Sequence, residues 1–329
     1  MYSFNRFIIL VFFLSLLNAC ASSNPNLSRA EEKVPVKKVH VKLRKYIEKL
    51  YSDDAKDRAW AVYNIGKAHK FAVSTVPYLV AMLGDNSIAV MNRNIGKNYT
   101  TGSTTTPADE AVRALAKIGQ SSVKPLLAVL NESDIEAVLK AIKTLGLLRD
   151  NEAIKPLAKF LSHEDKRIRL EAANSLSRYR NPWVADYLLK ALQSKSLQVR
   201  STALYAIGKR KNPVTIPTLI KLLDDPDITI RSQVLHILGG FRDERIVKPL
   251  LSQLNTSDIN FRLEVISALA NVRDYRVIEK LIALLRDDDK KIQVAAAESL
   301  SQIADVSIGV NYSKWNEWWQ NKIKRAAKN

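Results

Sequence analysis

Residues 156–176 read PLAKFLSHEDKRIRLEAANSL, and their apolar residues follow a helical spacing. Leu157 and Leu161 are four residues apart, so both lie on one face of a short helix. A polar turn follows, and Ile168 and Leu176 then mark the apolar face of a second helix. The stretch therefore predicts two helices that are joined by a turn and packed on each other.

The same pattern recurs at a spacing of 31 residues in six frames. The first helix of each frame carries two leucine ladders, at Leu126, Leu157, Leu188, Leu219, Leu250 and Leu281, and at Leu130, Leu161, Leu192, Leu223, Leu254 and Leu285. The second helix carries the ladders Ala137, Ile168, Val199, Ile230, Phe261 and Ile292, and Leu145, Leu176, Ile207, Leu238, Leu269 and Leu300. Because each pair can bury its apolar faces only against neighbouring pairs, the repetition predicts one elongated core.

Aspartates mark where the second helices begin, at Asp134, Asp165, Asp227, Asp258 and Asp289. A side-chain oxygen at this position accepts hydrogen bonds from the free N–H groups of the first helical turn. Two less regular frames precede the six, so we expect eight helical pairs between residues 43 and 305. The second frame contains an insertion at about residues 85–107, which we interpret as a loop because it is rich in Asn, Thr and Gly.

The repeat resembles the HEAT family, in particular the bacterial subtype named after the phycobilisome lyases. The signature of this subtype begins with Pro-Leu-x-x-x-Leu. An Asp, an apolar residue followed directly by Arg, an Ala and a Leu come after it. The matching residues are Pro156 to Leu161, Asp165, Ile168, Arg169, Ala172 and Leu176. The resemblance implies an all-α, right-handed α-solenoid of HEAT repeats. It implies little about function, because one fold carries many unrelated sites.

The C-terminal segment, residues 306–329, contains Trp315, Trp318 and Trp319 at helical spacing. A terminal repeat leaves one apolar face open, so we expect this segment to form a capping helix. An interfacial membrane helix with a basic rim is the alternative.

Residues 1–19 have the pattern of a signal peptide, with Arg6 before an apolar stretch from Phe7 to Ala19. The stretch ends in Leu17-Asn18-Ala19-Cys20, which resembles the bacterial lipobox. That resemblance implies cleavage before Cys20 and lipidation of its thiol, hence a membrane anchor. A plain secretory signal with a chance cysteine is the alternative.

We interpret residues 20–42 as a flexible tether between lipid and folded domain, because they contain prolines and show no helical periodicity. Ala21 follows the cysteine, whereas lipoproteins retained in the inner membrane usually carry Asp there. By resemblance this favours the outer membrane, facing the periplasm.

Signatures of catalysis are scarce in this sequence, which has four histidines and one cysteine. Deoxyhypusine hydroxylase, an enzyme with this kind of repeat, binds two irons through repeated His-Glu dyads. This chain has one such dyad, His163-Glu164, which is too few for a di-iron site. We therefore expect no enzyme activity, no cofactor and no metal, and an enzyme of the HEAT-like lyase or hydroxylase type is the less favoured reading.

The formal net charge of +18 comes partly from two basic ladders. One lies inside the second helices, at Arg169, Arg200, Arg231 and Arg262, and we expect these side chains to bridge neighbouring repeats, as in other HEAT proteins. The other ends the second helices, at Arg149, Arg180, Lys211, Arg242 and Arg273, where cations complement the helix dipole. An electropositive edge of this kind could also hold anionic partners. Nucleic acid is not expected, because a periplasmic anchor keeps the chain from the chromosome.

The sequence favours a protein–protein scaffold at a bacterial envelope membrane, with a binder of anionic lipid head groups, lipopolysaccharide or cell-wall polymer as the alternative. In HEAT proteins the second helices line the concave side, and their outward positions change chemistry from frame to frame. We expect a protein partner with an acidic surface in this groove, at Arg167, Glu171, Asn174, Arg178, Tyr205 and His236. The insertion offers a second candidate site at Arg93, Lys97 and Tyr99, or it is a tolerated loop without function.

Overall fold

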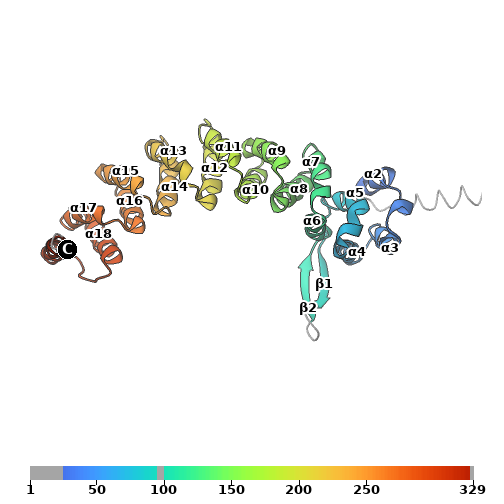
Figure 1. The fold of residues 1–329 in the computed structure, drawn as a ribbon, viewed down its shortest axis with the longest axis horizontal. Coiled ribbons are helices and arrows are strands. Elements are labelled where there is room, and N and C mark those ends of the chain that lie inside the picture. Colours follow the sequence, from blue (N-terminus) through green and yellow to red (C-terminus); the bar gives the residue numbers. More distant parts are fainter. Residues whose placement is uncertain (1–24, 95–99, 327–329) are drawn as a thin grey trace, which may run out of the picture. The chain divides into compact units, whose positions relative to one another are not determined.

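A computed structural model of the protein describes residues 25–94 and 100–326. The chain divides into two compact units, unit 1 (Met1–Tyr179) and unit 2 (Arg180–Asn329). Each unit is a series of helical pairs, and one two-stranded hairpin interrupts the helices of unit 1 (Figure 1). The prediction of an all-α helical-repeat fold with eight pairs is confirmed.

Unit 1 contains four helical pairs behind one leading helix, α2 (Pro25–Lys33). The pairs are α3 (Val41–Lys49) with α4 (Ala55–Lys67), α5 (Val76–Ala81) with α6 (Pro107–Ile118), α7 (Val123–Val129) with α8 (Ile135–Leu148), and α9 (Ile154–Lys159) with α10 (Lys166–Ser177). Strands β1 (Ala89–Asn94) and β2 (Thr100–Thr105) lie between α5 and α6.

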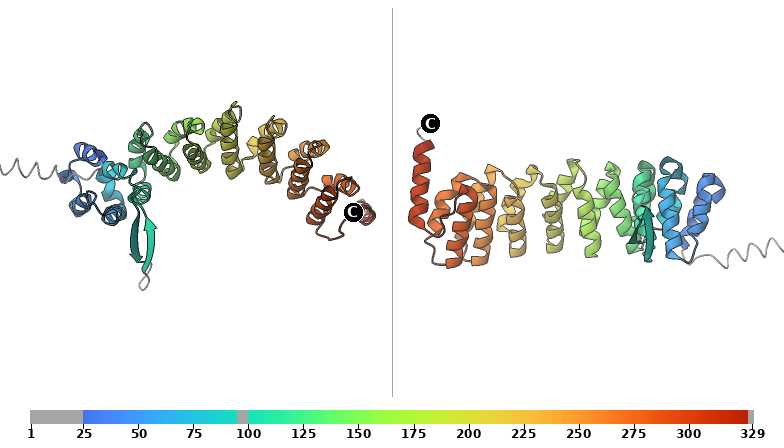
Figure 2. Two further views of the ribbon diagram at one scale, coloured as in Figure 1. Left: turned by 180° about the vertical axis from the view of Figure 1, so that it is seen from behind. Right: turned by 90° about the horizontal axis from the view of Figure 1, so that it is seen from below.

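Unit 2 contains the other four pairs and a closing helix, α19 (Tyr312–Ala326). The pairs are α11 (Trp183–Ala191) with α12 (Leu197–Arg210), α13 (Ile216–Lys221) with α14 (Ile228–Gly239), α15 (Val247–Ser252) with α16 (Ile259–Val272), and α17 (Ile278–Leu284) with α18 (Lys290–Ala304). Short 3-10 turns flank most of the first helices, so the second helices are the longer ones in both units (Figure 2).

The core follows the ladders of the sequence. All twelve leucines of the two first-helix ladders and all twelve residues of the two second-helix ladders are buried. The predicted aspartate caps are also present: Asp165, for example, accepts a hydrogen bond from the backbone N–H of Arg167 at 2.7 Å. Both results confirm the 31-residue register.

The second helices of unit 1 approach one another closely at small residues. A Cβ atom on Gly146 of α8 would lie 2.8 Å from the Cα atom of Ser175 on α10, closer than any real contact. Ser175 also donates a hydrogen bond from Oγ to the carbonyl of Ile142 at 3.0 Å. The glycine is therefore needed for this helix contact and not for a turn.

The N-terminal segment differs from the sequence prediction. Residues 25–42 are not a flexible tether, because α2 buries Leu27 and Ala30 completely or nearly so and packs against α5. The carbonyl of Val34 accepts a hydrogen bond from Tyr78 Oη at 2.6 Å. The prolines that suggested a tether mark helix boundaries instead: Pro25 occupies the first turn and Pro35 follows the last. Residues 1–24, with the predicted signal peptide and Cys20, lie outside the described part.

The insertion also differs from the prediction, because it forms an antiparallel β-hairpin and not an irregular loop (Figure 1). Ala89 pairs with Thr105, and the register continues to Asn94 opposite Thr100. One face of β1, with Ala89 and Met91, is buried against α4. A hairpin that packs on a helix is stable where an isolated one is marginal.

The predicted cap at the C-terminus is confirmed, because α19 packs against α17. Trp315 is completely buried and donates a hydrogen bond from Nε1 to the carbonyl of Gly309 at 2.9 Å. Trp319 stacks on Tyr275 and donates a hydrogen bond to Glu279 at 3.1 Å. Within residues 25–94 and 100–326, no helix has the length and apolarity needed to cross a bilayer.

Candidate functional site

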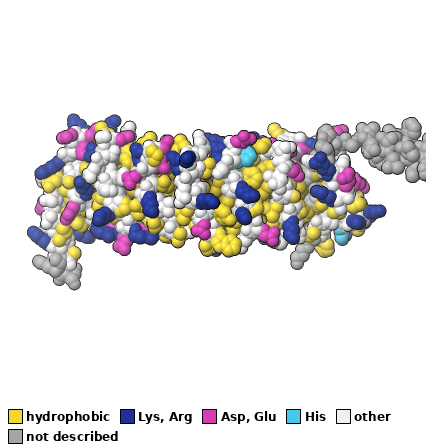
Figure 3. Space-filling model, turned by 90° about the horizontal axis from the view of Figure 1, so that it is seen from above, with side chains coloured by type: hydrophobic (Ala, Val, Ile, Leu, Met, Phe, Trp, Pro, Cys, Tyr) yellow, Lys and Arg dark blue, Asp and Glu magenta, His cyan; other side chains and the backbone are white. Residues whose placement is uncertain are grey.

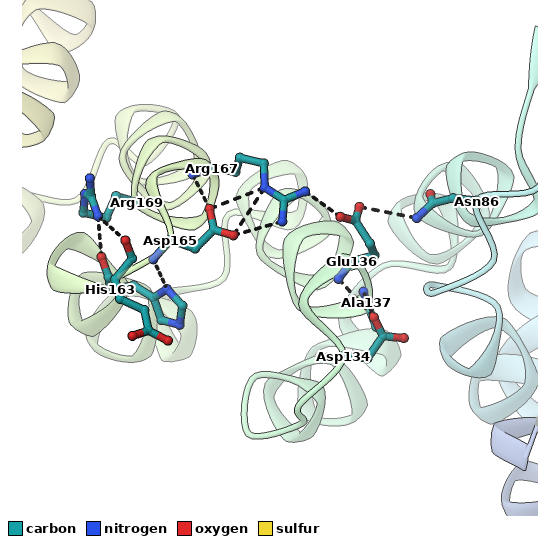
Figure 4. A network of polar contacts seen from close by, with 9 residues as sticks. Asn86, Asp134, Glu136, Ala137, His163, Asp165, Arg167 and Arg169 are labelled. Atoms are coloured by element: carbon teal, nitrogen blue, oxygen red, sulfur yellow. Dashed lines mark hydrogen bonds and ion pairs between the residues drawn. The ribbon is translucent and has the colours of Figure 1, made fainter.

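The predicted groove residue Arg167 lies in the first turn of α10, in a network of polar contacts (Figure 4). Its guanidinium donates from Nη1 to Glu136 Oε1 on α8 at 2.6 Å and from Nη2 to Asp165 Oδ2 at 2.9 Å. Asn86 donates to the other oxygen of Glu136 at 3.3 Å. A partner that used Arg167 for steering would therefore have to compete with two carboxylates of the chain itself.

A second pair of charges joins α6 and α8. Lys140 Nζ lies 2.7 Å from Asp109 Oδ1, and the two residues are one repeat apart in the sequence. Burial opposes ionisation of Asp109, but the hydrogen bond and the charge of Lys140 hold the pKa of its carboxyl below the usual value. The second-helix surface of unit 1 thus pairs its charges between successive repeats.

Glu171, Asn174 and Arg178 lie together on α10, as the sequence predicted. Burial raises the pKa of the Glu171 carboxyl above its usual value. The charges of Lys143 and Arg178 and a hydrogen bond with Asn174 lower this pKa, but the effect of burial is larger. The site is therefore a half-buried carboxyl group surrounded by cations.

Tyr205 and His236 belong to unit 2 and are exposed on α12 and α14, two second helices that pack on each other. The Tyr205 ring is 41% exposed, and Lys209 Nζ lies 4.9 Å from its centroid. Unit 2 holds this pair and unit 1 holds the other four predicted groove residues. The six residues form two separate sets, and the docking hypothesis for them stays a prediction.

The outward positions of unit 2 differ from those of unit 1. Gln198, Thr229, Asn260 and Lys291 occupy the positions equivalent to Glu136 and Arg167, and all four are exposed. As far as unit 2 is described, none of the four forms an ion pair. A cross-repeat contact of the second helices of unit 2 is instead the hydrogen bond between Gln233 Nε2 and Ser201 Oγ at 2.9 Å. The four outward positions, with Tyr205 and His236, are therefore exposed without an ion pair between repeats.

The hairpin of unit 1 is fixed at its base. Arg58 of α4 donates from Nε to Asp85 Oδ2 at 2.6 Å and from Nη2 to Ser87 Oγ at 3.1 Å. Of the three predicted site residues in the insertion, Arg93 lies in β1 opposite Thr101, while Lys97 and Tyr99 lie outside the described residues. Their role in binding stays a prediction.

Glu110 of α6 fixes the base of the hairpin on the side of β2, and the sequence reasoning did not identify it. Its buried carboxylate accepts hydrogen bonds from Thr105 Oγ1 at 2.8 Å and from Arg113 Nη1. Glu110 comes four residues after the helix cap, where regular repeats place the ladder arginine. An acid at an arginine position was the available signal.

The prediction that the ladder arginines bridge neighbouring repeats is confirmed for Arg200, Arg231 and Arg262. Arg200 donates from Nη1 to the carbonyls of Ser194 and Lys195 and pairs with Asp225 of the next repeat at 3.1 Å. Arg262 pairs in the same way with Asp287. Arg231 donates to carbonyl groups of the turn before its own helix, and its guanidinium lies 5.4 Å from the ring centroid of Phe261 in the next repeat. Arg169 donates to the carbonyl groups of His163 and Glu164, in the turn before its own helix.

The second basic ladder lies where the second helices end. Arg149, Lys211 and Arg273 are helix C-caps with φ values of 56°, 46° and 57°, in the left-handed region. These three residues, Arg180 and Arg242 are all exposed. In the part of the chain that is described, no hydrogen bond or ion pair involves the five side chains, so their charges face solvent.

The His163-Glu164 dyad has a structural role. His163 Nδ1 accepts a hydrogen bond from the backbone N–H of Asp165 at 3.0 Å (Figure 4). The His163 ring also stacks on Phe160. Among the described residues, no group of three or more His, Cys, Asp or Glu side chains could hold a metal ion.

The family model for HEAT repeats matches residues 123–208, 185–258 and 247–308. The three matches together cover more than half of the chain. The chain belongs to the HEAT-repeat family. No curated protein matches the sequence.

Several solved structures resemble this HEAT-repeat protein at low identity. The complex of CpcE and CpcF of phycocyanin lyase from Nostoc sp. PCC7120 shares 19% identity at a TM-score of 0.33, covering 80% of this chain and 95% of that one. Human deoxyhypusine hydroxylase in complex with glycerol shares 16% identity at a TM-score of 0.35, and the match covers 80% of this chain and 96% of that one. An engineered protein shares 19% identity at a TM-score of 0.38, and the match covers 80% of this chain and 79% of that one. These likenesses carry no information about activity.

Proposed function

We propose that this HEAT-repeat protein is a non-catalytic scaffold that binds another protein and is held at a bacterial envelope membrane. The observation that supports this best is the open second-helix surface of unit 2. Exposed side chains at its outward positions change from repeat to repeat while the buried ladders stay constant. A stacking surface has no need of such variation, whereas a recognition surface does.

The membrane attachment is proposed from the sequence. The apolar stretch that ends in Leu17-Asn18-Ala19-Cys20 supports lipidation of Cys20, and Ala21 supports the outer membrane, facing the periplasm. Two or more acyl chains anchor a protein stably where one does not. Cys20→Ser should release the protein from the membrane fraction or stall its processing, and unchanged fractionation would contradict the proposal.

The partner is proposed to be a protein with an acidic surface that docks around Tyr205. Interface anchors are enriched in tyrosine, and Tyr205 presents an exposed ring beside the cation of Lys209. Crosslinking in cells, followed by identification of co-purified proteins, should capture this partner.

Tyr205→Ala should weaken retention of the captured partner by at least about 1 kcal/mol while leaving the melting temperature nearly unchanged. Trp183→Ala is the matched control, because Trp183 is a 64% exposed aromatic residue on the first helix of the same pair. Equal losses of partner retention in both variants would contradict the groove assignment. A lower melting temperature with unchanged partner retention in Tyr205→Ala would contradict it as well.

A second candidate is favoured by the basic edge of unit 2. Arg180, Lys211, Arg242 and Arg273 present one exposed cation per repeat, a spacing that suits an anionic envelope polymer or lipid head groups. Replacing all four by Gln should abolish salt-sensitive retention on such a polymer. Retention that the four changes leave intact would rule this candidate out, and bound metal or turnover would point to an enzyme instead.

A further inference from the structure

The N-terminal end of unit 1 exposes large apolar side chains that no helix covers. Val41 is 67% exposed, Phe71 68% and Val73 43%. Phe71 is held against His40, the N-cap of α3, with ring centroids 5.4 Å apart. The contact brings Phe71 to the N-terminal end of α3, where Val41 is the first residue, and Val73 lies two residues after Phe71. Exposed apolar side chains that gather at one end of a unit are of the kind that marks an interaction surface.

Exposed lysines lie close to Val41 in the sequence. The segment from Pro25 to Leu50 contains eight Lys and Arg residues against three Glu. Lys37, Lys38 and Lys42 are exposed, and among the contacts of the described residues none pairs them with an acid. Figure 3 shows Lys and Arg side chains, with Asp and Glu side chains among them, at the end of unit 1 next to the grey segment.

The turn that carries Lys37 and Lys38 is fixed in place. Arg44 donates from Nη2 to the carbonyl of Lys37 at 2.6 Å and from Nε to the carbonyl of Val39 at 3.1 Å. Its guanidinium thus ties the 3-10 turn Val36–Lys38 to α3. The two lysines and Val41 are presented together by a rigid segment.

The position of α2 limits how far the first helix of unit 1 can be from a lipid on Cys20. Four residues separate Cys20 from Pro25, where α2 begins, so the connection spans at most about 18 Å. An unstructured segment up to residue 42 would have reached about 75 Å. Because α2 is packed through Leu27 and Ala30, it cannot extend without losing buried contacts.

We propose that Val41, Phe71 and Val73, with Lys37, Lys38 and Lys42, form a surface that docks on an anionic lipid membrane. The inference rests on the proposed lipidation of Cys20, which supplies the short connection. Apolar side chains enter the head-group region, and lysines attract anionic lipids over a distance of about 8 Å. The lipid would anchor the chain, and this surface would set its orientation.

The test uses the full-length, processed protein in vesicles of phosphatidylcholine with or without phosphatidylglycerol. Cys20 is the only cysteine of the sequence and is blocked by its lipid, so Val41→Cys provides the single free thiol for an environment-sensitive fluorophore. The label at position 41 should shift to the blue and be quenched by lipid-attached quenchers when phosphatidylglycerol is present. Ile88→Cys is the control, because Ile88 is 74% exposed and apolar but lies beside the hairpin.

In the Val41→Cys background, Lys37→Glu, Lys38→Glu and Lys42→Glu together should reduce the docked fraction relative to the undocked one on the order of 100-fold. The chain should still float with the vesicles. Equal quenching at positions 41 and 88, or a label at 41 that stays in water while the chain floats, would overturn the docking surface alone. A chain that does not float at all would overturn the anchor and the surface together.

Discussion

The second helices of the two units use the same sequence positions for different purposes. In unit 1 the outward residues pair with one another across repeats, as Glu136 does with Arg167 and Asp109 with Lys140. In unit 2 the positions equivalent to Glu136 and Arg167 are exposed and form no ion pair among the described residues, and Gln233, equivalent to Lys140, forms a neutral hydrogen bond with Ser201 of the preceding repeat. An outward position in a repeat protein can therefore strengthen the stack or be left for a partner, and the sequence period alone does not distinguish the two.

The buried ladders should behave alike in both units. Leu157→Ala in unit 1 and Leu219→Ala in unit 2 each remove a completely buried side chain at the same repeat position. We expect each change to lower the free energy of unfolding by about 2–5 kcal/mol, measured by urea denaturation. A loss below 1 kcal/mol in only one unit would show that the two cores are not equivalent.

The hairpin is specific to unit 1, and Glu110 is the residue that should reveal this. Glu110→Ala leaves Thr105 and Arg113 without their common acceptor, so we expect a loss of about 1–3 kcal/mol. Hydrogen exchange should speed up in β2 before it does in α8. Glu132→Ala, at an exposed site of the same unit, is the control. Equal hydrogen-exchange rates of β2 in both variants would show that Glu110 does not anchor the hairpin.

Much of the fold could be predicted because the repeat encodes it many times over. Leu157 and Asp165 carry the same information as their equivalents in every regular frame, so an error at one position is corrected by the others. The hairpin occurs once and has no such support. Its signals were the alternation of Ile88, Val90 and Asn92 with Ala89 and Met91 and the β-branched residues of β2, which predict strands.

The site could be predicted only in part, because exposure does not reveal pairing. The sequence placed Arg167 and Tyr205 correctly on the outward faces of second helices. It could not show that Arg167 reaches Glu136 one repeat earlier, because that contact depends on side-chain length and helix spacing. Likewise, α2 was mistaken for a tether because a helix of nine residues gives a weak periodic signal between two prolines.

Removing one charge from the second-helix surface of each unit should change the free energy of unfolding in unit 1 more than in unit 2. Lys140→Met should cost about 0.2–1 kcal/mol at neutral pH, because Asp109 loses its partner. Glu264→Gln changes the equivalent position in unit 2, which is exposed, and should cost nothing measurable. Urea denaturation of both variants measures the difference, and a similar loss from each would contradict the contrast between the units.

The cost of Lys140→Met should also depend on pH. The pKa of Asp109 is lower in the folded chain than in the unfolded one, so its contribution is present above the unfolded value of about 4 and is lost as the pH falls through the folded value. The variant and the wild type should therefore converge in acid. A constant difference from neutral pH down to acid would mean that packing of the lysine stem, not the ion pair, stabilises unit 1.

Glu171 should show the opposite trend and the smallest effect. Burial raises the pKa of its carboxyl in the folded chain above the unfolded value, although Lys143, Asn174 and Arg178 oppose the shift. The stabilising contribution of the protonated form is complete below the unfolded pKa and is lost as the pH rises through the folded one. Glu171→Gln keeps the shape without the charge, so it should raise the melting temperature slightly at neutral pH and have no effect in acid.

Glu264→Gln is again the control, since its carboxyl is exposed at the equivalent position. A melting temperature that falls at neutral pH would show that the surrounding cations stabilise the ionised carboxylate more than burial penalises it, and Glu171 would then join the paired charges of unit 1.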